Sequence, residues 1–453
     1  MAHDDDSAAG GDDRPATRGK RFFKLATMTA SVAGRYASTT LRSAFQSPEK
    51  RAEERAASHR RSGEEIAETL GQLKGAAMKL GQMASVGSDL LPKELADALV
   101  KLQKEAPPMP VAVIREQIEA EFGAPPETLF SHFEDRPFAA ASIGQVHRGR
   151  TDDGREVVVK VQYPGVDASV DSDLNHLHLA LRASGLVNRV HRAALADVFE
   201  ELRARLHEEL DYTIEADNLR IFRNFHKKHD FLVIPDVVGE RSSKRVLTLT
   251  FEPGHSVTEL VREGWSQDTK DTIGRNIVRM LVAQIFDLQT VHADPNPGNF
   301  AFHEDGRIVI YDFGCVKEVK AEVLAAWRDL VASGIRDDYE GVERGLRSLK
   351  ARNLEVSALP DGYYKGWRDI LVQPFRADLQ PYDFAAARLR EQLVEKKMDA
   401  LRHIAAFQPP VELVFLDRAI AGHYGTLKAL GARGDYFPEI AEAFGLRRDE
   451  APR

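Results

Sequence analysis

The sequence has very little cysteine, no long apolar run and no large excess of either charge. Cys315 is its one cysteine among 453 residues, which excludes a disulfide framework and a cysteine zinc site and suits a reducing compartment. The most apolar stretches, such as IVRMLVAQIFDLQTV, are interrupted by Arg279 and Asp287, so we expect no transmembrane helix. The acidic start argues against a signal peptide. With 62 Lys+Arg against 70 Asp+Glu, a net charge of -8 argues against a general nucleic-acid binder.

The composition is that of a soluble globular protein, with 43% hydrophobic and 29% charged residues. The length suits several domains or one two-lobed enzyme. Residues 1–17 are predicted to form a disordered acidic tail. Residues 18–42 contain six cations and no acid, with apolar residues at helical spacing, among them Met28. Such a helix could lie on an anionic membrane or pack on its own domain with a solvated basic face, and the sequence leaves both open.

The order of predicted elements is helices, a small β-rich part, and then a larger helical part. Helices are expected over about 45–135. FAAASIGQVHRGR and REVVVKVQYPG predict two strands joined by a tight turn. Long helices are expected over about 166–186 and 193–226, with further strands in FLVIPDVV and RVLTLTFEPG. Beyond Gly254 the pattern is helical, with one short strand in RIVIYDFG.

Two features early in this order could carry chemistry. Lys160 lies in the apolar strand VVVKV, and a lysine is rarely buried without a partner. Taken alone, Lys160 is more simply interpreted as a strand-edge lysine that faces solvent. EELDYTIEADN supplies candidate partners in Glu208, Glu209, Asp211 and Glu215. Asp211 and Glu215 are four apart and would share a helix face. The residues alone do not say which acid pairs with Lys160.

Two later features are polar loops with the residue types that bind magnesium nucleotides. In HADPNPGNF, the spacing of Asp294 and Asn299 matches the D-x-x-x-x-N of a kinase catalytic loop, where Asp handles a proton and Asn binds Mg²⁺. The prolines and glycine of this loop exclude a regular helix. In YDFG, Asp312 follows an apolar strand, from which a carboxylate can reach a metal on the phosphates. The four features in this order indicate Mg-nucleotide phosphoryl chemistry.

These motifs resemble those of the UbiB/AarF atypical kinases, a protein-kinase-like family linked to ubiquinone and other isoprenoid lipids. The resemblance runs from about Gly71 to Leu430 and includes KLGQ, AAASIGQVH, VVVK, ELD followed by EA-N, HADPNPGN and DFG. It implies an α+β, two-lobed, protein-kinase-like fold. The expected parts are a helical N-terminal extension over 18–135, an N-lobe over 136–254 and a largely helical C-lobe over 255–453.

The resemblance also implies a role for each site residue. Lys160 is expected to contact the α- and β-phosphates and to pair with Glu215. Asp294 is expected to be the catalytic-loop carboxylate, and Asn299 and Asp312 to hold Mg²⁺. The remaining nucleotide-site positions implied are Lys79 and Gln82 facing Glu209 and Asp211, the loop residues Ala139, Ala140, Ala141, Ser142, Gly144 and Gln145, and the hinge residues Thr248, Leu249, Thr250, Phe251 and Glu252.

The sequence departs from an ordinary protein kinase in two places. Alanines 139–141 stand where a protein kinase has G-x-G-x-x-G, and each Cβ keeps the backbone farther from the phosphates. We therefore expect altered nucleotide geometry and slow or unusual phosphoryl transfer. No A-P-E follows DFG, so a peptide-binding activation segment is not evident. Cys315 is predicted to be a packing residue, and His292 a structural brace of the catalytic loop.

The preferred hypothesis is an atypical kinase or ATPase that binds Mg-ATP or Mg-ADP and supports isoprenoid-quinone or membrane-lipid metabolism. We expect it in the cytoplasm or against the inner face of a membrane, with a nucleotide and an anionic lipid or isoprenoid as partners and no nucleic acid. A second hypothesis is a non-catalytic, nucleotide-gated module that binds a membrane or a partner. A third, a kinase of the antibiotic or choline type, is disfavoured by KLGQ and AAASIGQVH.

Overall fold

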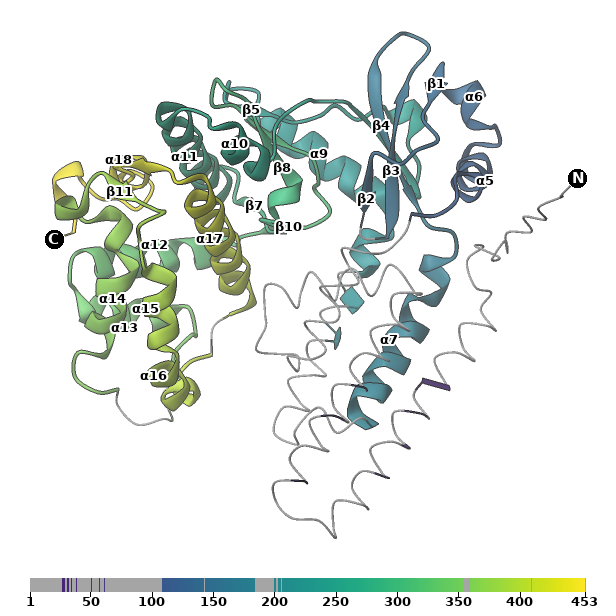
Figure 1. The fold of residues 1–453 in the computed structure, drawn as a ribbon. Coiled ribbons are helices and arrows are strands. Elements are labelled where there is room, and N and C mark those ends of the chain that lie inside the picture. Colours follow the sequence, from purple (N-terminus) through teal and green to yellow (C-terminus); the bar gives the residue numbers. More distant parts are fainter. Residues whose placement is uncertain are drawn as a thin grey trace, which may run out of the picture. The chain divides into compact units, whose positions relative to one another are not determined.

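The computed structural model describes residues 108–141, 143–183, 199–200, 203–204, 206–353, 355, 359–408 and 410–452, with a few isolated residues before them. The chain forms two compact units (Figure 1). Unit 1 comprises residues 1–216 and 237–251, and unit 2 comprises residues 217–236 and 252–453. The expected nucleotide-site residues Lys79, Gln82 and Ser142 lie outside the described residues. So does most of the basic segment 18–42, although Met28 is buried in the core of unit 1.

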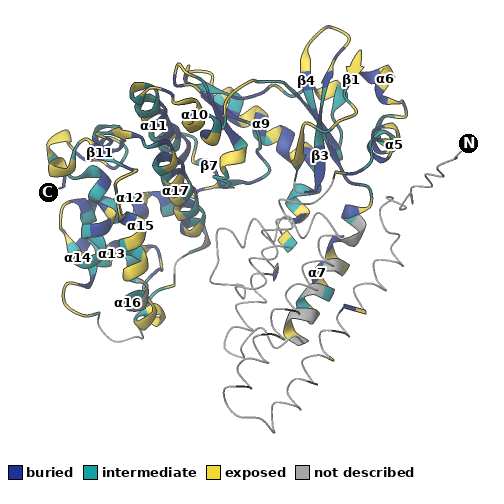
Figure 2. Cartoon of the chain, in the orientation of Figure 1, coloured by how far each residue is buried: buried dark blue, intermediate teal, exposed yellow. Residues whose placement is uncertain are grey.

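Unit 1 is built on a five-stranded sheet in the order β1-β3-β4-β6, with β2 also paired to β3. Its strands are β1 (His132–Phe133), β2 (Ala139–Ala141), β3 (Gly144–Arg150), β4 (Glu156–Gln162) and β6 (Val246–Thr250). The predicted hairpin is confirmed, since β3 pairs antiparallel with β4 through a turn containing Gly154 at φ +87°. Along β4, Val157, Val159 and Val161 are buried, whereas Val158 and Lys160 on the other face are half-buried (Figure 2). This alternation places Lys160 on the face away from the core.

In the described part of unit 1, the helices with given bounds are α5 (Val111–Phe122), α6 (Pro126–Leu129), α7 (Val166–Ala183) and the first turn of α9 (Tyr212–His226), and residues 206–209 are also helical. Both α5 and α7 follow the predicted ranges. The single helix expected over about 193–226 is wrong at residues 210–211, where the chain leaves the helical conformation. The Asp211 carboxylate accepts the amide of Thr213 at 3.0 Å there, and a side chain bonded in this way starts a new helix.

Residues 217–236 belong to unit 2, although they fall within the range expected for the N-lobe. Two contacts explain this: Asn218 donates to the carbonyl of Phe313 at 3.0 Å, and the ring of Phe222 packs on that of Phe313. In addition, β5 (Leu232–Val233) pairs in parallel with β9 (Ile308–Ile310). Of the strand expected in FLVIPDVV, only these two residues of β5 form a strand.

Unit 2 is mostly helical, as predicted. Its helices, besides the rest of α9, are α10 (Val257–Glu263), α11 (Gln267–Val282), α12 (Ala321–Ile335), α13 (Tyr339–Ser348), α14 (Tyr363–Leu371), α15 (Leu389–Glu395), α16 (Lys397–Arg402), α17 (Val411–Leu430) and α18 (Phe437–Ala441). None of the helices in the described ranges combines the length and apolarity needed to cross a membrane. Cys315 is buried in the core with Val291, Trp327 and Leu416, which confirms its predicted packing role.

The expectation of a single strand beyond Gly254 is wrong. The short strands are β7 (Thr290–His292), β8 (Phe300–Phe302), β9, β10 (Val316–Glu318), β11 (Tyr382–Asp383) and β12 (Arg433–Gly434). Each has two or three residues, too few for a period-two pattern to stand out. Two antiparallel pairs, β8 with β9 and β7 with β10, surround the predicted catalytic loop.

Candidate nucleotide-binding and catalytic site

Lys160 is paired with a carboxylate in unit 1. Its Nζ lies 2.8 Å from Oε2 and 2.9 Å from Oε1 of Glu215, and the two side chains are 15% and 5% exposed. The ammonium also lies 5.0 Å from the ring centroid of Tyr212, one turn earlier on α9. Strand β4 and helix α9 thus place a nearly buried amine between a carboxylate and an aromatic ring. Among the acids that the sequence left open, Glu215 is the partner.

Asp211 and Glu209, the other two acids assigned to the site, each have a hydrogen bond within unit 1, which for Glu209 is through its backbone carbonyl. Asp211 accepts from the amide and hydroxyl of Thr213 and lies 3.9 Å from Nζ of Lys244. The carbonyl of Glu209 accepts from the side chain of Gln162 at 3.2 Å. Both acids therefore help to shape the turn that leads into α9. Their expected partners Lys79 and Gln82 lie in the part of the chain that is not described.

The alanine loop is an ordered strand in unit 1. Ala139 pairs with Val146 and Ala141 with Gly144, and Ala139 and Ala140 are exposed. A Cβ at Gly144 would overlap the carbonyl of Val161 on the next strand. Glycine is therefore required here by strand pairing itself, whatever binds near the alanines.

Gln145 lies in the core of unit 1, so its side chain points away from the face that carries Lys160. It is 1% exposed, and its amide exchanges two hydrogen bonds with the backbone of Met109, at 2.9 and 3.3 Å. It also lies 2.9 Å from His147, whose other ring nitrogen contacts the carbonyl of Glu134. Burial lowers the pKa of His147. Gln145 and His147 are polar residues at alternate positions of β3, a pattern that could have indicated these buried hydrogen bonds.

The expected hinge, Thr248 to Glu252, contains the last of the three points at which the chain passes from one unit to the other. The chain passes from unit 1 to unit 2 between Phe251 and Glu252. Thr248 is buried and its hydroxyl donates to the carbonyl of Arg241. Arg148 lies over the Phe251 ring, 4.0 Å from its centroid. Leu249 and Thr250 pair with Val158 and Val157 of β4, respectively.

The predicted catalytic loop lies in unit 2 between β7 and β8. Its first residue is held by a hydrogen bond from the amide of Ala293 to the carbonyl of Cys315 at 2.9 Å. The side chain of Asn296 accepts the amide of Gly298, so the expected non-helical loop contains one 3₁₀ turn, η4 (Pro297–Asn299). Asn299 Nδ2 then donates back to Asp294, at 3.1 Å to Oδ2 and 3.2 Å to the carbonyl.

Asp312 lies beside this loop because β8 and β9 form a hairpin. The amide of Tyr311 donates to the carbonyl of Asn299 at 2.9 Å, and this bond places Asp312, the residue after Tyr311, beside the loop. Asp312 Oδ1 accepts the amide of Gly314 at 2.9 Å, and its carbonyl lies 2.6 Å from His292 Nε2. His292 is buried and its ring packs edge-on against those of Phe300 and Phe313. It joins the catalytic loop to the DFG segment, as the predicted brace should.

Asn299 and Asp312 fit the requirements of a magnesium ion. The amide nitrogen of Asn299 is used by Asp294, so Oδ1 is the end of this amide that remains for a cation. Amide and carboxylate oxygens are ligands that Mg²⁺ takes, with phosphates and water completing its octahedron. Across the described residues no group of three or more His, Cys, Asp or Glu could hold a metal. An ion here would therefore depend on the nucleotide for further oxygens.

Sequence reasoning missed Arg418, which reaches this loop from α17. One guanidinium nitrogen of Arg418 lies 3.3 Å from Asp294 Oδ1, and the side chains are 21% and 19% exposed. Nothing in the sequence around Arg418 marks it, since the pattern beyond Gly254 predicts only helices there. The contact depends on tertiary packing between residues far apart along the chain.

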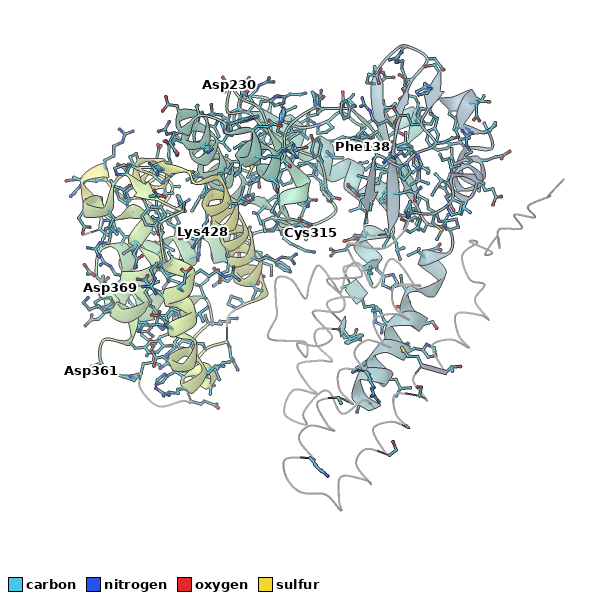
Figure 3. The ribbon with its side chains drawn as sticks, viewed as in Figure 1. Phe138, Asp230, Cys315, Asp361, Asp369 and Lys428 are labelled. Atoms are coloured by element: carbon cyan, nitrogen blue, oxygen red, sulfur yellow. The ribbon has the colours of Figure 1, made fainter. Side chains whose placement is uncertain are left out.

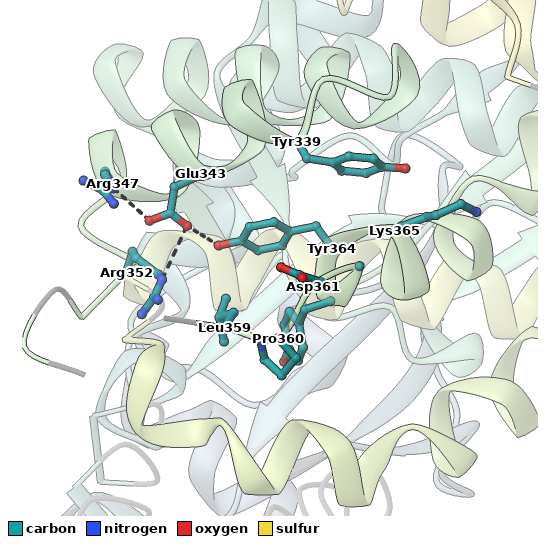
Figure 4. A pocket seen from close by; sticks show the side chains of 11 residues that line it. Tyr339, Glu343, Arg347, Arg352, Leu359, Pro360, Asp361, Tyr364 and Lys365 are labelled. Carbon is teal, nitrogen blue, oxygen red and sulfur yellow. Dashed lines mark hydrogen bonds and ion pairs between the residues drawn. The ribbon is translucent and has the colours of Figure 1, made fainter. Parts of the chain in front are cut away.

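Unit 2 also contains a pocket of about 390 Å³ between α13 and α14 (Figure 4). At one side of it Glu343 is bound by Arg347 at 2.8 Å, by Arg352 at 3.4 Å and by the hydroxyl of Tyr364. These groups hold the pKa of Glu343 below its ordinary value although burial acts in the opposite direction. The Glu343 carboxylate is thus satisfied by its neighbours, which indicates an internal charge network joining the two helices.

The chain is similar to proteins of one kinase-like family. Residues 101–346 match the model of the ABC1 atypical kinase-like domain. The atypical kinase COQ8, mitochondrial, of Saccharomyces cerevisiae is 31% identical over 371 residues, 81% of this chain and 73% of that protein. The probable serine/threonine-protein kinase abkA of Dictyostelium discoideum is 31% identical over 386 residues, 80% of this chain and 67% of that protein. The chain spans about half (52%) of a third relative, the atypical kinase coq-8, mitochondrial, of Caenorhabditis elegans.

A solved structure is also similar. It is the complex of Rv3197 with erythromycin from Mycobacterium tuberculosis, at a TM-score of 0.61 and 28% sequence identity, covering 82% of this chain and 93% of that one. Together with the family match, this likeness confirms the predicted α+β, protein-kinase-like fold.

Proposed function

We propose that this chain, which belongs to the ABC1 atypical kinase-like family, is an atypical kinase or ATPase that binds Mg-ATP. The observation that carries the proposal is the clustering of Asp294, Asn299 and Asp312 within one hydrogen-bonded region of unit 2. The ion pair of Lys160 with Glu215 in unit 1 supports it independently.

Each residue has a role in this proposal. Lys160, oriented by Glu215, would bind the α- and β-phosphates of the nucleotide. Asn299 and Asp312 would hold Mg²⁺, which when bound offsets phosphate charge during transfer. Asp294 would orient the attacking hydroxyl or water and accept its proton. The hinge around Phe251 would lie beside the adenine.

The metabolic setting is proposed from the relatives and the motifs. Relatives named COQ8 and the UbiB/AarF-type motifs favour ubiquinone or other isoprenoid-lipid metabolism. The basic residues of segment 18–42 favour a place at an anionic membrane surface. The similar M. tuberculosis protein was solved with erythromycin, so a macrolide belongs among the ligands to be tested.

A nucleotide-gated module without catalysis is the second candidate. It is favoured by Ala139 and Ala140, whose exposed Cβ atoms keep the β2 backbone from approaching phosphates as closely as glycine would. This candidate predicts that nucleotide stabilises the protein and changes its binding to anionic vesicles, without turnover.

The test compares Mg-dependent ATP turnover of the wild type and Asp312→Asn, with and without anionic liposomes. The proposal expects the variant to lose most of the activity. Asp305→Asn is the matched control, because Asp305 is an exposed acid paired with Arg307 in the turn between β8 and β9. Equal rates in wild type and Asp312→Asn would remove the catalytic claim. Thermal stabilisation by Mg-ATP without turnover would select the second candidate.

A further inference from the structure

We infer that Arg418, on helix α17, is a positioning residue for Asp294. The inference rests on the proposed function, in which Asp294 is the catalytic-loop carboxylate. Helix α17 (Val411–Leu430) follows the family-model match, which ends at residue 346. It runs beside β7 and β10, the strands that flank the loop and the DFG segment (Figure 1).

Arg418 and Asn299 together fix the orientation of the Asp294 carboxylate. Asn299 donates to Oδ2 at 3.1 Å, and a guanidinium nitrogen of Arg418 donates to Oδ1 at 3.3 Å. Donors on both oxygens define the rotation of the carboxylate about its last side-chain bond, which a single donor would leave free. The Nε of Arg418 is buried and has no hydrogen-bond partner among the described residues. For the described part of the chain, Asp294 is therefore the acceptor that this guanidinium engages.

The same helix also holds the loop backbone in place. Gly422 is one turn beyond Arg418, on the same face, and a Cβ at Gly422 would overlap the ring of Pro295. The next residue, His423, is buried, and its ring packs edge-on against Phe300 with centroids 5.0 Å apart. Helix α17 thus contacts the loop at its carboxylate and at the residue after it, and it also packs on the first residue of β8.

The N-terminal part of α17 is tied to the segment that follows DFG. Glu412 pairs with Lys320 at 3.0 Å, and Lys317 lies over the ring of Phe415, 5.5 Å from its centroid. The helix therefore spans both the catalytic loop and the DFG segment. A charge placed by such a helix can hold the Asp294 carboxylate in one geometry through the reaction, and small displacements of a reacting group can cost up to about 100-fold in rate.

The test uses the full-length chain with Arg418→Gln, Arg418→Lys and the control Lys428→Gln. Lys428 is a half-buried cation on the same helix, ten residues beyond Arg418, where it donates to Glu391 and to the carbonyl of Ala387 (Figure 3). We expect Arg418→Gln to lower kcat for ATP turnover about 10- to 100-fold while KM stays within about twofold. Arg418→Lys should recover part of kcat, and Lys428→Gln should match the wild type. A loss that appears in KM, or an equal loss in Arg418→Lys and Arg418→Gln, would overturn the inference.

A second readout separates this inference from the proposed function. If the wild type does not turn over ATP, the enzyme proposal fails, but hydrogen exchange of the backbone amides of Asn296, Gly298 and Asn299 still reports on the loop. We expect faster exchange there in Arg418→Gln than in wild type and Lys428→Gln. Exchange unchanged by Arg418→Gln would show that Arg418 does not position the loop.

Discussion

Lys160 Nζ lies 2.8 Å from Glu215 Oε2, although 55 residues separate the two along the chain. Strand β4 carries the lysine and the first turn of α9 carries the glutamate. Both side chains are largely removed from water, at 15% and 5% exposed, so each charge is stabilised by the other. The pair therefore ties the sheet of unit 1 to α9, besides any part it has in binding phosphate.

We expect Glu215→Ala to lower the free energy of unfolding by about 3 kcal/mol, because it removes a carboxylate at 2.8 Å from the nearly buried Lys160 ammonium. Lys160→Met should lower the free energy of unfolding by a similar amount, because it removes the ammonium from the nearly buried Glu215 carboxylate. The double variant Lys160→Met with Glu215→Leu should be closer to the wild type than the sum of the single losses. Urea unfolding followed by circular dichroism measures all four proteins, and strictly additive losses would contradict a coupled pair.

Gln145 offers a test of structural against nucleotide-binding roles. Replacing it by leucine leaves the buried amide and carbonyl of Met109 without their partner, which should cost about 1–3 kcal/mol. Because its side chain points into the core, we expect the affinity for Mg-ADP, measured by calorimetry, to remain within about twofold. The control is Gln408→Leu at an exposed position. If Gln145→Leu greatly lowers the affinity for Mg-ADP but leaves stability unchanged, Gln145 would instead be a nucleotide-binding residue.

Much of the fold could be predicted from the sequence, and the reasons differ from element to element. The β3–β4 hairpin was predictable because it has two seven-residue strands and a turn glycine. The break before α9 was not, since Asp211 looks like an ordinary helix-face acid until its carboxylate is seen bonded to Thr213. The strands around the catalytic loop have only three residues each, so the alternation of apolar and polar residues is too short to predict them.

The sequence could predict those parts of the candidate site whose residues all lie in one short segment. Asp294 and Asn299 lie five residues apart, and their hydrogen bond follows from that local loop. The choice of Glu215 over its acidic neighbours and the contact from Arg418 depend on how distant segments pack, which no local pattern encodes.

Two glycines of α17 form a matched pair. A Cβ at Gly422 would overlap Pro295, whereas a Cβ at Gly425 meets nothing within 4 Å. We expect Gly425→Ala to stabilise the protein by up to about 1 kcal/mol, because alanine favours a helix over glycine. Gly422→Ala should instead destabilise it by about 1–3 kcal/mol, since a rigid proline ring has to move.

Thermal unfolding of both variants checks this prediction, and ATP turnover shows whether the catalytic loop moves with Pro295. Equal stability of the two variants would mean that α17 and the loop are not in close contact.

The acid sensitivity of unit 2 should depend on His423. Burial, with a smaller contribution from nearby His292, lowers the pKa of His423 to about 3. In the unfolded chain a histidine titrates near about 6.5, so between these values the unfolded state binds a proton that the native state does not. Stability contributed by neutral His423 is therefore fully present above about pH 6.5 and is lost as the pH falls toward 3.

We expect His423→Phe, which keeps a ring against Phe300, to lessen the loss of unfolding free energy with acid by up to about 1.4 kcal/mol per pH unit. Urea midpoints at pH 7.5, 6 and 5 measure this slope. His132→Gln, at an exposed position on β1, should keep the wild-type slope. If wild type and His423→Phe lose stability in parallel, His423 is not the group that takes up the proton, and the acid sensitivity arises at another site such as His226, whose pKa burial also lowers to about 3.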